Sequence, residues 1–306
     1  MRSWNVRAAA LGYVCLACMA SPAVAATEPD DKPTAVEERL AAERAARDLQ
    51  FVITPHRPNY VMAYTHNRKG NERSLIGVVS AEDVNDVKDE EVKFQISFKL
   101  ALWQQVFNTK TDLFFAFTST AWWQLYSDDI SSPFRETNYE PELFLRHYGG
   151  PKIFGVRPTF WDVGLNHQSN GRADPISRSW NRVTGGTVFD FGDFALGLRG
   201  WLRLPEDDDD DNNPNMYRYY GYGEARLAWA PNKHTVTAMV RPGTEKFSYE
   251  LTWSYPLPTA LRLYVQYFNG YGESLLDYNL RTERIGFGVA INDFLQRQPQ
   301  RPPNKP

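Results

Sequence analysis

The stretch Val92-Lys93-Phe94-Gln95-Ile96-Ser97-Phe98-Lys99-Leu100-Ala101-Leu102 alternates strictly between two kinds of side chain. Every even position is apolar, whereas positions 93, 95, 97 and 99 carry lysine, glutamine, serine and lysine. A period of two is typical of a β-strand with one apolar and one polar face. The same alternation recurs in 247–255 and 261–267, so we expect an all-β fold.

Strand number and loop length indicate which all-β fold. We predict twelve strands, near 60–67, 91–106, 111–126, 140–149, 156–170, 177–191, 194–205, 217–230, 234–242, 246–256, 261–270 and 282–293. Several exceed the roughly 9–11 residues that cross a bilayer with tilt. Short turns such as 108–110 alternate with longer connections such as 68–90. This pattern predicts a 12-stranded antiparallel transmembrane β-barrel of the bacterial outer membrane.

Composition says less about the fold class than the pattern of strands and loops does. The chain has 306 residues, a formal net charge of -3 and 14% aromatic residues. This charge gives no indication of a basic surface for nucleic acid. Beyond the N-terminus, no apolar run approaches the roughly 20 residues of a membrane helix. Many aromatic residues with low mean hydropathy suit an outer-membrane barrel and a soluble β-sandwich about equally, so the barrel prediction depends on the loops.

The chain divides into four predicted parts. Residues 1–25 are typical of a secretory signal, with Arg2 and Arg7 before an apolar run and a small-residue cleavage site at 23–25. Residues 26–50 form a charged, loosely packed periplasmic arm, in which Thr34 and Glu37 predict the capping box of a helix. Residues 51–294 form the barrel, and we expect residues 295–306 to be a disordered tail. Both cysteines lie within 1–25, so no disulfide is expected after cleavage.

The stretch Asn166-His167-Gln168-Ser169-Asn170-Gly171-Arg172 holds the candidate chemistry. His167 and Ser169 share their parity with Val163 and Leu165, so they continue the apolar column that faces lipid. Polar residues facing lipid are costly unless they have a function. The alternative is that both residues lie at head-group level, where serine and histidine are tolerated.

Asn181 favours the functional interpretation. If the turn 170–178 closes a hairpin that pairs Ser169 with Ser179, then Asn181 lies opposite His167 on the same face, about 5 Å away between Cβ atoms. Ser169 is then the nucleophile, His167 its general base and Asn181 the group that orients the imidazole. The N–H of Gly171 is a suitable oxyanion donor.

Oxygen donors surround this turn. Asp174, Ser177 and the carbonyl groups of 171–177 are hard ligands of the kind that calcium prefers. The acidic run 206–211 is either a solvated loop or a contributor to a cation site.

The chain resembles bacterial outer membrane phospholipase A over roughly residues 50–294. The matching motifs are the stretch 166–182, Trp122-Trp123-Gln124-Leu125, 131–141, and Gly270-Tyr271-Gly272-Glu273-Ser274-Leu275. The resemblance implies hydrolysis of phospholipid and lysophospholipid acyl esters at sn-1 and sn-2, dependence on Ca²⁺, and activation by homodimerisation.

The resemblance also implies roles for particular residues. Ser169, His167 and Asn181 are the implied triad, with the Gly171 N–H as oxyanion donor. Ser131 of one subunit would share a dimer calcium with the Arg172 carbonyl and Ser177 of the other. The position of a calcium in the monomer falls at Asn212, and Asp211 beside it is the candidate ligand. The alternative from a different functional class is a passive or structural outer-membrane barrel in which these residues are incidental.

Overall fold

The structure is a computed structural model that describes residues 32–47, 52–72, 78–207 and 211–295. The predicted signal segment 1–25 and residues 296–306 of the predicted tail lie outside the described residues. Every described helix and strand belongs to one compact unit that begins at Pro33.

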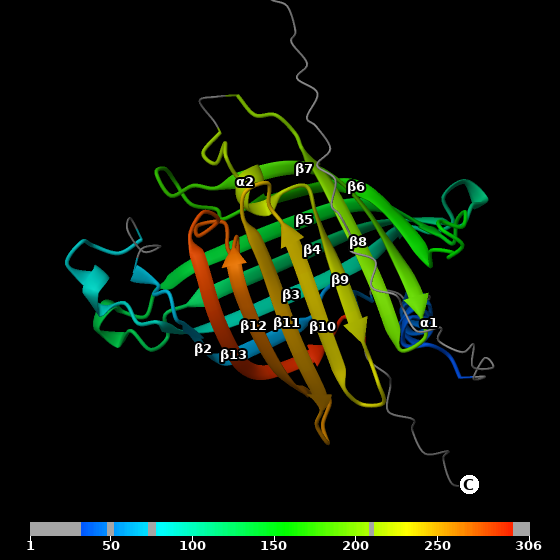
Figure 1. Cartoon of the computed structure of the whole chain (residues 1–306), viewed down its shortest axis with the longest axis horizontal. Coiled ribbons are helices and arrows are strands. Elements are labelled where there is room, and N and C mark those ends of the chain that lie inside the picture. Colours follow the sequence, from blue (N-terminus) through cyan, green and yellow to red (C-terminus); the bar gives the residue numbers. More distant parts are fainter. Residues whose placement is uncertain (1–31, 48–51, 73–77, 208–210, 296–306) are drawn as a thin grey trace, which may run out of the picture. The chain divides into compact units, whose positions relative to one another are not determined.

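Twelve long antiparallel strands, β2 to β13, form one closed sheet (Figure 1). Each strand pairs with its neighbours in sequence, and β13 pairs with β2 to complete the circle. The strands are β2 (Asn59–Asn67), β3 (Glu90–Trp103), β4 (Thr111–Trp123), β5 (Phe134–Tyr148), β6 (Phe160–Ser169), β7 (Ser179–Phe191), β8 (Phe194–Arg203), β9 (Gly223–Trp229), β10 (Thr235–Pro242), β11 (Phe247–Pro256), β12 (Arg262–Tyr271) and β13 (Arg281–Asn292). The predicted twelve-stranded barrel is confirmed.

Shorter elements complete the fold. A two-residue strand, β1 (Thr54–Pro55), pairs with β3, and the helices are α1 (Ala35–Arg47) and α2 (Tyr217–Tyr220). The described residues also contain the 3₁₀ turns η2 (Asp83–Asp86), η3 (Val106–Asn108) and η4 (Asp128–Ile130). In the described part of the chain, no helix is long and apolar enough to cross a membrane.

Two strand starts differ most from the prediction. β5 begins at Phe134 rather than near 140, and the first residues of the predicted strand 217–230 form α2. Tyr220 of α2 is buried in an aromatic cluster with Trp180 and Trp201. Gly221 then turns the chain into β9 with φ +62, where a Cβ would meet the Pro242 carbonyl oxygen at 1.9 Å. Packing at this point overrides the β-propensity of the tyrosines.

The faces of the strands are inverted relative to a soluble protein. On β3, Ser97 and Lys99 are 1% and 2% exposed, whereas Ile96 is 56% exposed. On β6, Val163 and Leu165 are each 55% exposed, whereas Asn166 is 3% exposed. A soluble β-sandwich would bury the apolar face. The polar faces therefore line an enclosed lumen, and the apolar faces form the outer wall.

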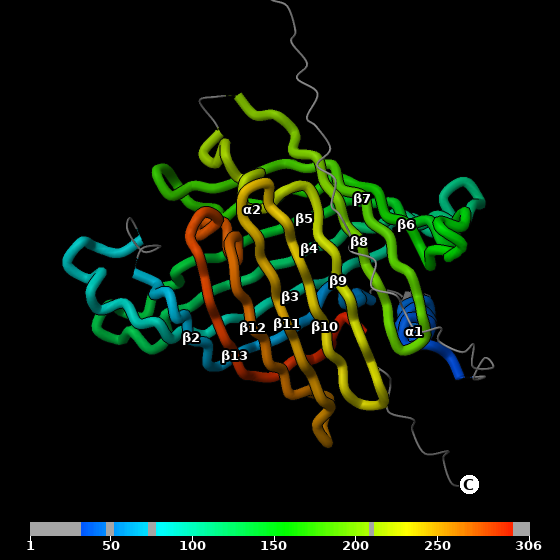
Figure 2. Tube along the Cα trace, in the orientation of Figure 1, coloured from blue at the N-terminus to red at the C-terminus, as the bar shows by residue number. Residues whose placement is uncertain are grey.

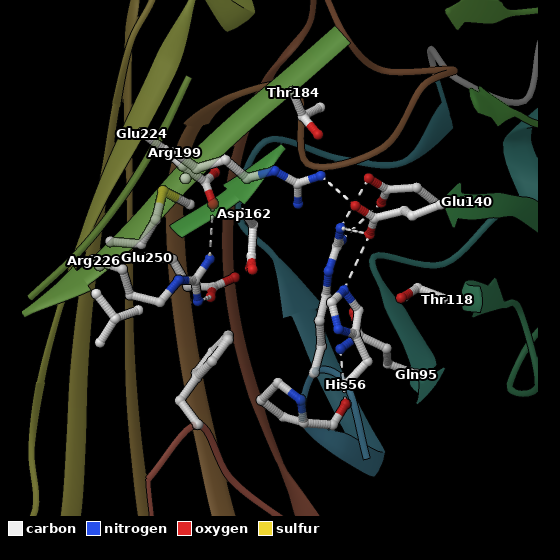
Figure 3. A pocket seen from close by; sticks show the side chains of 18 of the residues that line it. His56, Gln95, Thr118, Glu140, Asp162, Thr184, Arg199, Glu224, Arg226 and Glu250 are labelled. Carbon is white, nitrogen blue, oxygen red and sulfur yellow. Dashed lines mark hydrogen bonds and ion pairs between the residues drawn. The ribbon is translucent and has the colours of Figure 1, made fainter. Parts of the chain in front are cut away.

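Ion pairs fill much of the lumen. Arg57 bonds to Glu140 at 2.7 Å and to Glu142 at 2.6 Å, and Arg182 bonds to Glu140 at 3.0 Å. A cavity of about 400 Å³ remains. Figure 3 shows Glu140, His56 and other polar side chains lining it.

Helix α1 packs against the barrel at the end with the short turns (Figure 2). The predicted capping box is present: the Thr34 N–H donates to Glu37 at 2.9 Å, and the Glu37 N–H donates to the Thr34 hydroxyl at 3.1 Å. The prediction of a loosely packed arm differs from the structure, because Val36 of α1 is buried in an apolar cluster with Leu295. Lys99 also pairs with Glu43 of α1 at 2.8 Å. The segment 26–50 has few apolar residues, so its sequence did not predict that α1 packs against the barrel.

Candidate active site

The β6–β7 hairpin carries the candidate site on its outward face. Ser169 pairs with Ser179, and His167 pairs with Asn181, so the register predicted from the sequence is confirmed. The alternate residues face the lumen: Gln168 accepts a 2.9 Å hydrogen bond from the buried Trp180 indole. The hairpin thus separates a structural face from a candidate catalytic face.

The imidazole of His167 is held by Asn181. Its Nδ1 lies 2.8 Å from Asn181 Oδ1. Because an amide oxygen only accepts hydrogen bonds, this contact requires the proton on Nδ1 and leaves Nε2 free as a base. In the described part of the chain, no hydrogen bond joins Ser169 to His167, although both lie half-buried on one face two residues apart. Such contacts often tighten only when substrate binds.

A fourth residue, which the sequence did not assign to the site, contacts Asn181. The Asn181 Nδ2 donates to Glu206 Oε1 at 3.1 Å, and Arg203 Nη2 donates to Glu206 Oε2 at 2.8 Å. The sequence places Glu206 at the start of an acidic loop, 25 residues after Asn181. The β7–β8 pairing brings the two together, since the Leu204 N–H bonds to the Asn181 carbonyl at 2.8 Å. Glu206 could be found only by extending the strand register beyond β8.

Hydrogen bonds from the Asn170 side chain stabilise the turn after Ser169. Its Oδ1 accepts from the Arg178 N–H at 3.0 Å, and its Nδ2 donates to the Ile176 carbonyl at 2.8 Å. Gly171 follows with φ +65, and a Cβ there would meet the Tyr139 ring at 3.3 Å. No hydrogen bond between described residues uses the Gly171 N–H. This donor next to Ser169 is therefore available to a ligand.

The predicted calcium donors fall into two groups. Arg172 and Ser177 belong to the same turn; the Arg172 side chain bonds to the Phe134 carbonyl at 2.8 Å, and the Ser177 hydroxyl accepts from Asn212 at 3.1 Å. Ser131 lies at the end of η4, and no described contact joins it to either residue. The structure of one chain therefore does not bring the three together.

Asp211 is engaged elsewhere. Its Oδ1 accepts from Arg203 at 2.6 Å and from the Asn213 N–H at 3.1 Å. Among the described residues, no group of three or more His, Cys, Asp or Glu side chains is placed to hold a metal ion. Binding of a cation by Asp211 would require competition with Arg203.

Comparison with known proteins identifies the family. Residues 36–291 match the model of the family described as phospholipase A1. The phospholipase A1 of Escherichia coli (strain K12) is 35% identical over 269 residues, which cover 87% of this chain and 91% of that protein. The chain belongs to the phospholipase A1 family.

Solved structures of this family share the fold. An active-site asparagine-to-alanine mutant of outer membrane phospholipase A from Escherichia coli has a TM-score of 0.74 and 34% identity, covering 80% of this chain and 94% of that one. The Salmonella typhi outer membrane phospholipase dimer with bound calcium also has a TM-score of 0.74 and 34% identity, covering 80% and 93%. The chain is thus an outer-membrane phospholipase of this family, and its barrel lies in the bacterial outer membrane.

Proposed function

We propose that this phospholipase hydrolyses the sn-1 and sn-2 acyl esters of phospholipids and lysophospholipids with a Ser169-His167-Asn181 triad on the lipid-facing wall, in a calcium-dependent homodimer. The observation that carries the proposal is the 2.8 Å contact between His167 and Asn181, two residues from Ser169 on the same outward face. An active-site asparagine in the Escherichia coli relative supports the role of Asn181.

The reaction follows from the atoms at this face. His167 Nε2 takes the proton of Ser169 as its Oγ attacks the acyl carbonyl, and Asn181 keeps the ring in the tautomer that allows this transfer. The Gly171 N–H stabilises the negative oxygen of the tetrahedral intermediate. His167 then returns the proton to the departing glycerol oxygen, and a water molecule releases the fatty acid by the same steps in reverse. Because the triad lies on the outer wall, acyl chains reach it by lateral diffusion.

The oxygen atoms in the turn after Ser169 are of the kind that binds calcium. The Ser177 hydroxyl and the Arg172 carbonyl are hard oxygen ligands, and no described hydrogen bond uses the Arg172 carbonyl. Their turn also carries the Gly171 N–H, so a cation held there would add positive charge beside the oxyanion. Two donors from one chain are too few for calcium, which takes about 6–8 oxygen ligands.

In this proposal, a second copy of the chain supplies a further oxygen ligand for the calcium ion. Ser131 would reach the ion as the partner subunit's Ser131, and water would complete the shell. The calcium-bound dimer of the Salmonella typhi relative supports this arrangement. A calcium role for Asp211 in the monomer remains a separate prediction, which requires its pair with Arg203 to open.

The nucleophile is tested by Ser169→Ala, with Ser179→Ala as the matched control on the paired position of the same face. We expect fatty-acid release from phospholipid vesicles to fall at least 10³-fold in the first variant, because no hydroxyl remains to attack. The control should retain activity, and both barrels should remain folded on heat-shift electrophoresis. Normal turnover by Ser169→Ala would overturn the proposed function.

Calcium dependence is tested by removing the ion. Chelation with EDTA should abolish turnover of the wild-type protein, and added calcium should restore it. Ser177→Ala should need a higher calcium concentration for half-maximal activity, because one oxygen ligand is lost. Turnover that is insensitive to EDTA would contradict the ligand assignment but leave the triad intact.

A passive pore is the alternative function. Conductance across planar bilayers separates the two, since a pore carries a steady current without releasing fatty acid. The ion pairs between Arg57, Glu140 and Arg182 across the lumen oppose a wide water-filled channel.

A further inference from the structure

The orientation of the Asn181 amide decides whether His167 can act as a base. An amide has an oxygen on one side and an NH₂ group on the other, and the two sides are almost equal in shape. With Oδ1 towards His167, the imidazole carries its proton on Nδ1 and Nε2 is basic. With the amide reversed, the NH₂ group would donate to Nδ1 and move the ring proton to Nε2, where the ring could not accept the Ser169 proton. Asparagine therefore has an orientation problem that the symmetric carboxylate of an aspartate does not have.

We propose that Glu206 is a positioning residue that fixes the Asn181 amide in its productive orientation. A carboxylate only accepts hydrogen bonds, and Glu206 Oε1 lies 3.1 Å from Asn181 Nδ2. Reversal of the amide would place Asn181 Oδ1 against this carboxylate oxygen, which is repulsive. Glu206 thus selects the orientation in which Asn181 accepts from His167 at 2.8 Å.

Glu206 is itself held in place. Arg203, the last residue of β8, donates to Glu206 Oε2 at 2.8 Å. The same guanidinium donates to the Asn213 carbonyl at 2.9 Å, so both sides of the acidic loop are tied to the end of β8. The backbone bond from Leu204 to Asn181 then keeps the start of this loop beside β7. A row of side chains therefore leads from the proposed nucleophile to the guanidinium group of Arg203. Its members are Ser169, His167, Asn181, Glu206 and Arg203.

This inference rests on the proposed function, and its test begins with Glu206→Gln. Glutamine preserves size and polarity, but its amide can donate as well as accept, so it lets the Asn181 amide reverse. We expect kcat for phospholipid hydrolysis to fall about 10-fold or more with KM unchanged. The adjacent Asp207 is exposed, and its side chain has no hydrogen bond among the described residues, so Asp207→Asn is the matched control and should keep full activity.

Combining Glu206→Gln with two variants of Asn181 separates a positioning role of Glu206 from a general loosening of the acidic loop. In Asn181→Ala, addition of Glu206→Gln should cause no further loss, because the residue through which Glu206 acts is gone. In Asn181→Asp, the effect should change sign: two facing carboxylates repel, so addition of Glu206→Gln should raise activity. A loop effect on Ser177 would instead lower activity in both backgrounds.

The outcomes distinguish the two proposals. If Ser169→Ala is inactive but Glu206→Gln behaves as wild type, the positioning role is wrong and the triad stands. Equal losses from Glu206→Gln in all three backgrounds would likewise overturn it. If Ser169→Ala is active, the proposed function itself fails.

Discussion

Asn181 and Arg182 are neighbours in β7, yet their side chains lie in opposite environments. Arg182 faces the lumen, is 5% exposed, bonds to Glu140 at 3.0 Å and lies 3.9 Å from the centre of the Trp180 ring. Asn181 faces outward and is half-buried, and among the described residues its side chain forms hydrogen bonds only with His167 and Glu206. The lumen thus contains polar groups that share several partners, as Glu140 does with Arg57, Asn166 and Arg182. On the outer face of the hairpin, the side chain of Asn181 instead joins one short row of hydrogen bonds, from His167 to Glu206.

In this proposal, side chains with a structural role have several polar partners, whereas side chains with a catalytic role have few. Burial of charge is tolerated only when partners satisfy it, so lumen residues occur in networks. A catalytic base must keep one lone pair free, so its site is incompletely satisfied by design. Loss of a residue should therefore affect stability on one face of the hairpin and turnover on the other.

The largest expected effect is on the outer wall. His167→Ala should lower kcat on the order of 10⁴-fold, because no other group takes the Ser169 proton. The free energy of unfolding should change by less than about 0.5 kcal/mol, as for other surface substitutions. Turnover on mixed micelles and urea unfolding in detergent measure the two quantities.

His147→Ala is the matched control for this variant. His147 also faces outward, from β5 near the end with the short turns, and hydrogen-bonds to Thr111 at 2.9 Å. It should leave kcat unchanged. Equal loss of activity in the two variants would remove the distinction between the catalytic row and the rest of the wall.

The next effect is on the lumen. Glu140→Ala removes the shared partner of Arg57, Arg182 and Asn166. Loss of one member of a buried ion pair leaves uncompensated charge, so the free energy of unfolding should fall by about 3 kcal/mol. The folded fraction should keep its kcat, since Glu140 lies on the opposite face from the triad. A stable but inactive variant would show that the two faces are coupled.

A smaller effect is expected from pH. Burial lowers the pKa of His56 from 6.5 to about 4, against the opposing effect of Glu142, to which its Nε2 lies 3.2 Å away. The unfolded chain takes up this proton below pH 6.5, whereas the folded protein does not until pH 4. Stability from this group is present above pH 6.5 and is lost as the pH falls through the window between the two values.

The free energy of unfolding should therefore fall by roughly 2 kcal/mol between pH 7 and pH 5 through His56 alone. His56→Gln should flatten this part of the profile relative to wild type, as measured by urea unfolding at each pH. An identical slope in the two proteins would assign the pH dependence to other groups.

The strand pattern and the register of the candidate site were readable from the sequence because both depend on local periodicity. Side chains alternate with a period of two, so parity placed His167 and Ser169 outward, and the hairpin register placed Asn181 opposite. The alternation of short and long connections between twelve predicted strands then indicated a transmembrane barrel. These features involve residues close in sequence or repeated along it.

Other features depended on packing between distant segments. Alternation alone does not say which face is buried; the predicted barrel placed the apolar faces outward, and closure of the sheet exposes Ile96 and buries Lys99. The packing of α1 requires the pair Glu43–Lys99, which spans 56 residues. The contact of Glu206 with Asn181 requires the β7–β8 register to continue into a loop that reads in sequence as a solvated acidic run. Local periodicity therefore determined the barrel and the register of its candidate-site hairpin, whereas the partners that hold them arose from pairing across the closed sheet.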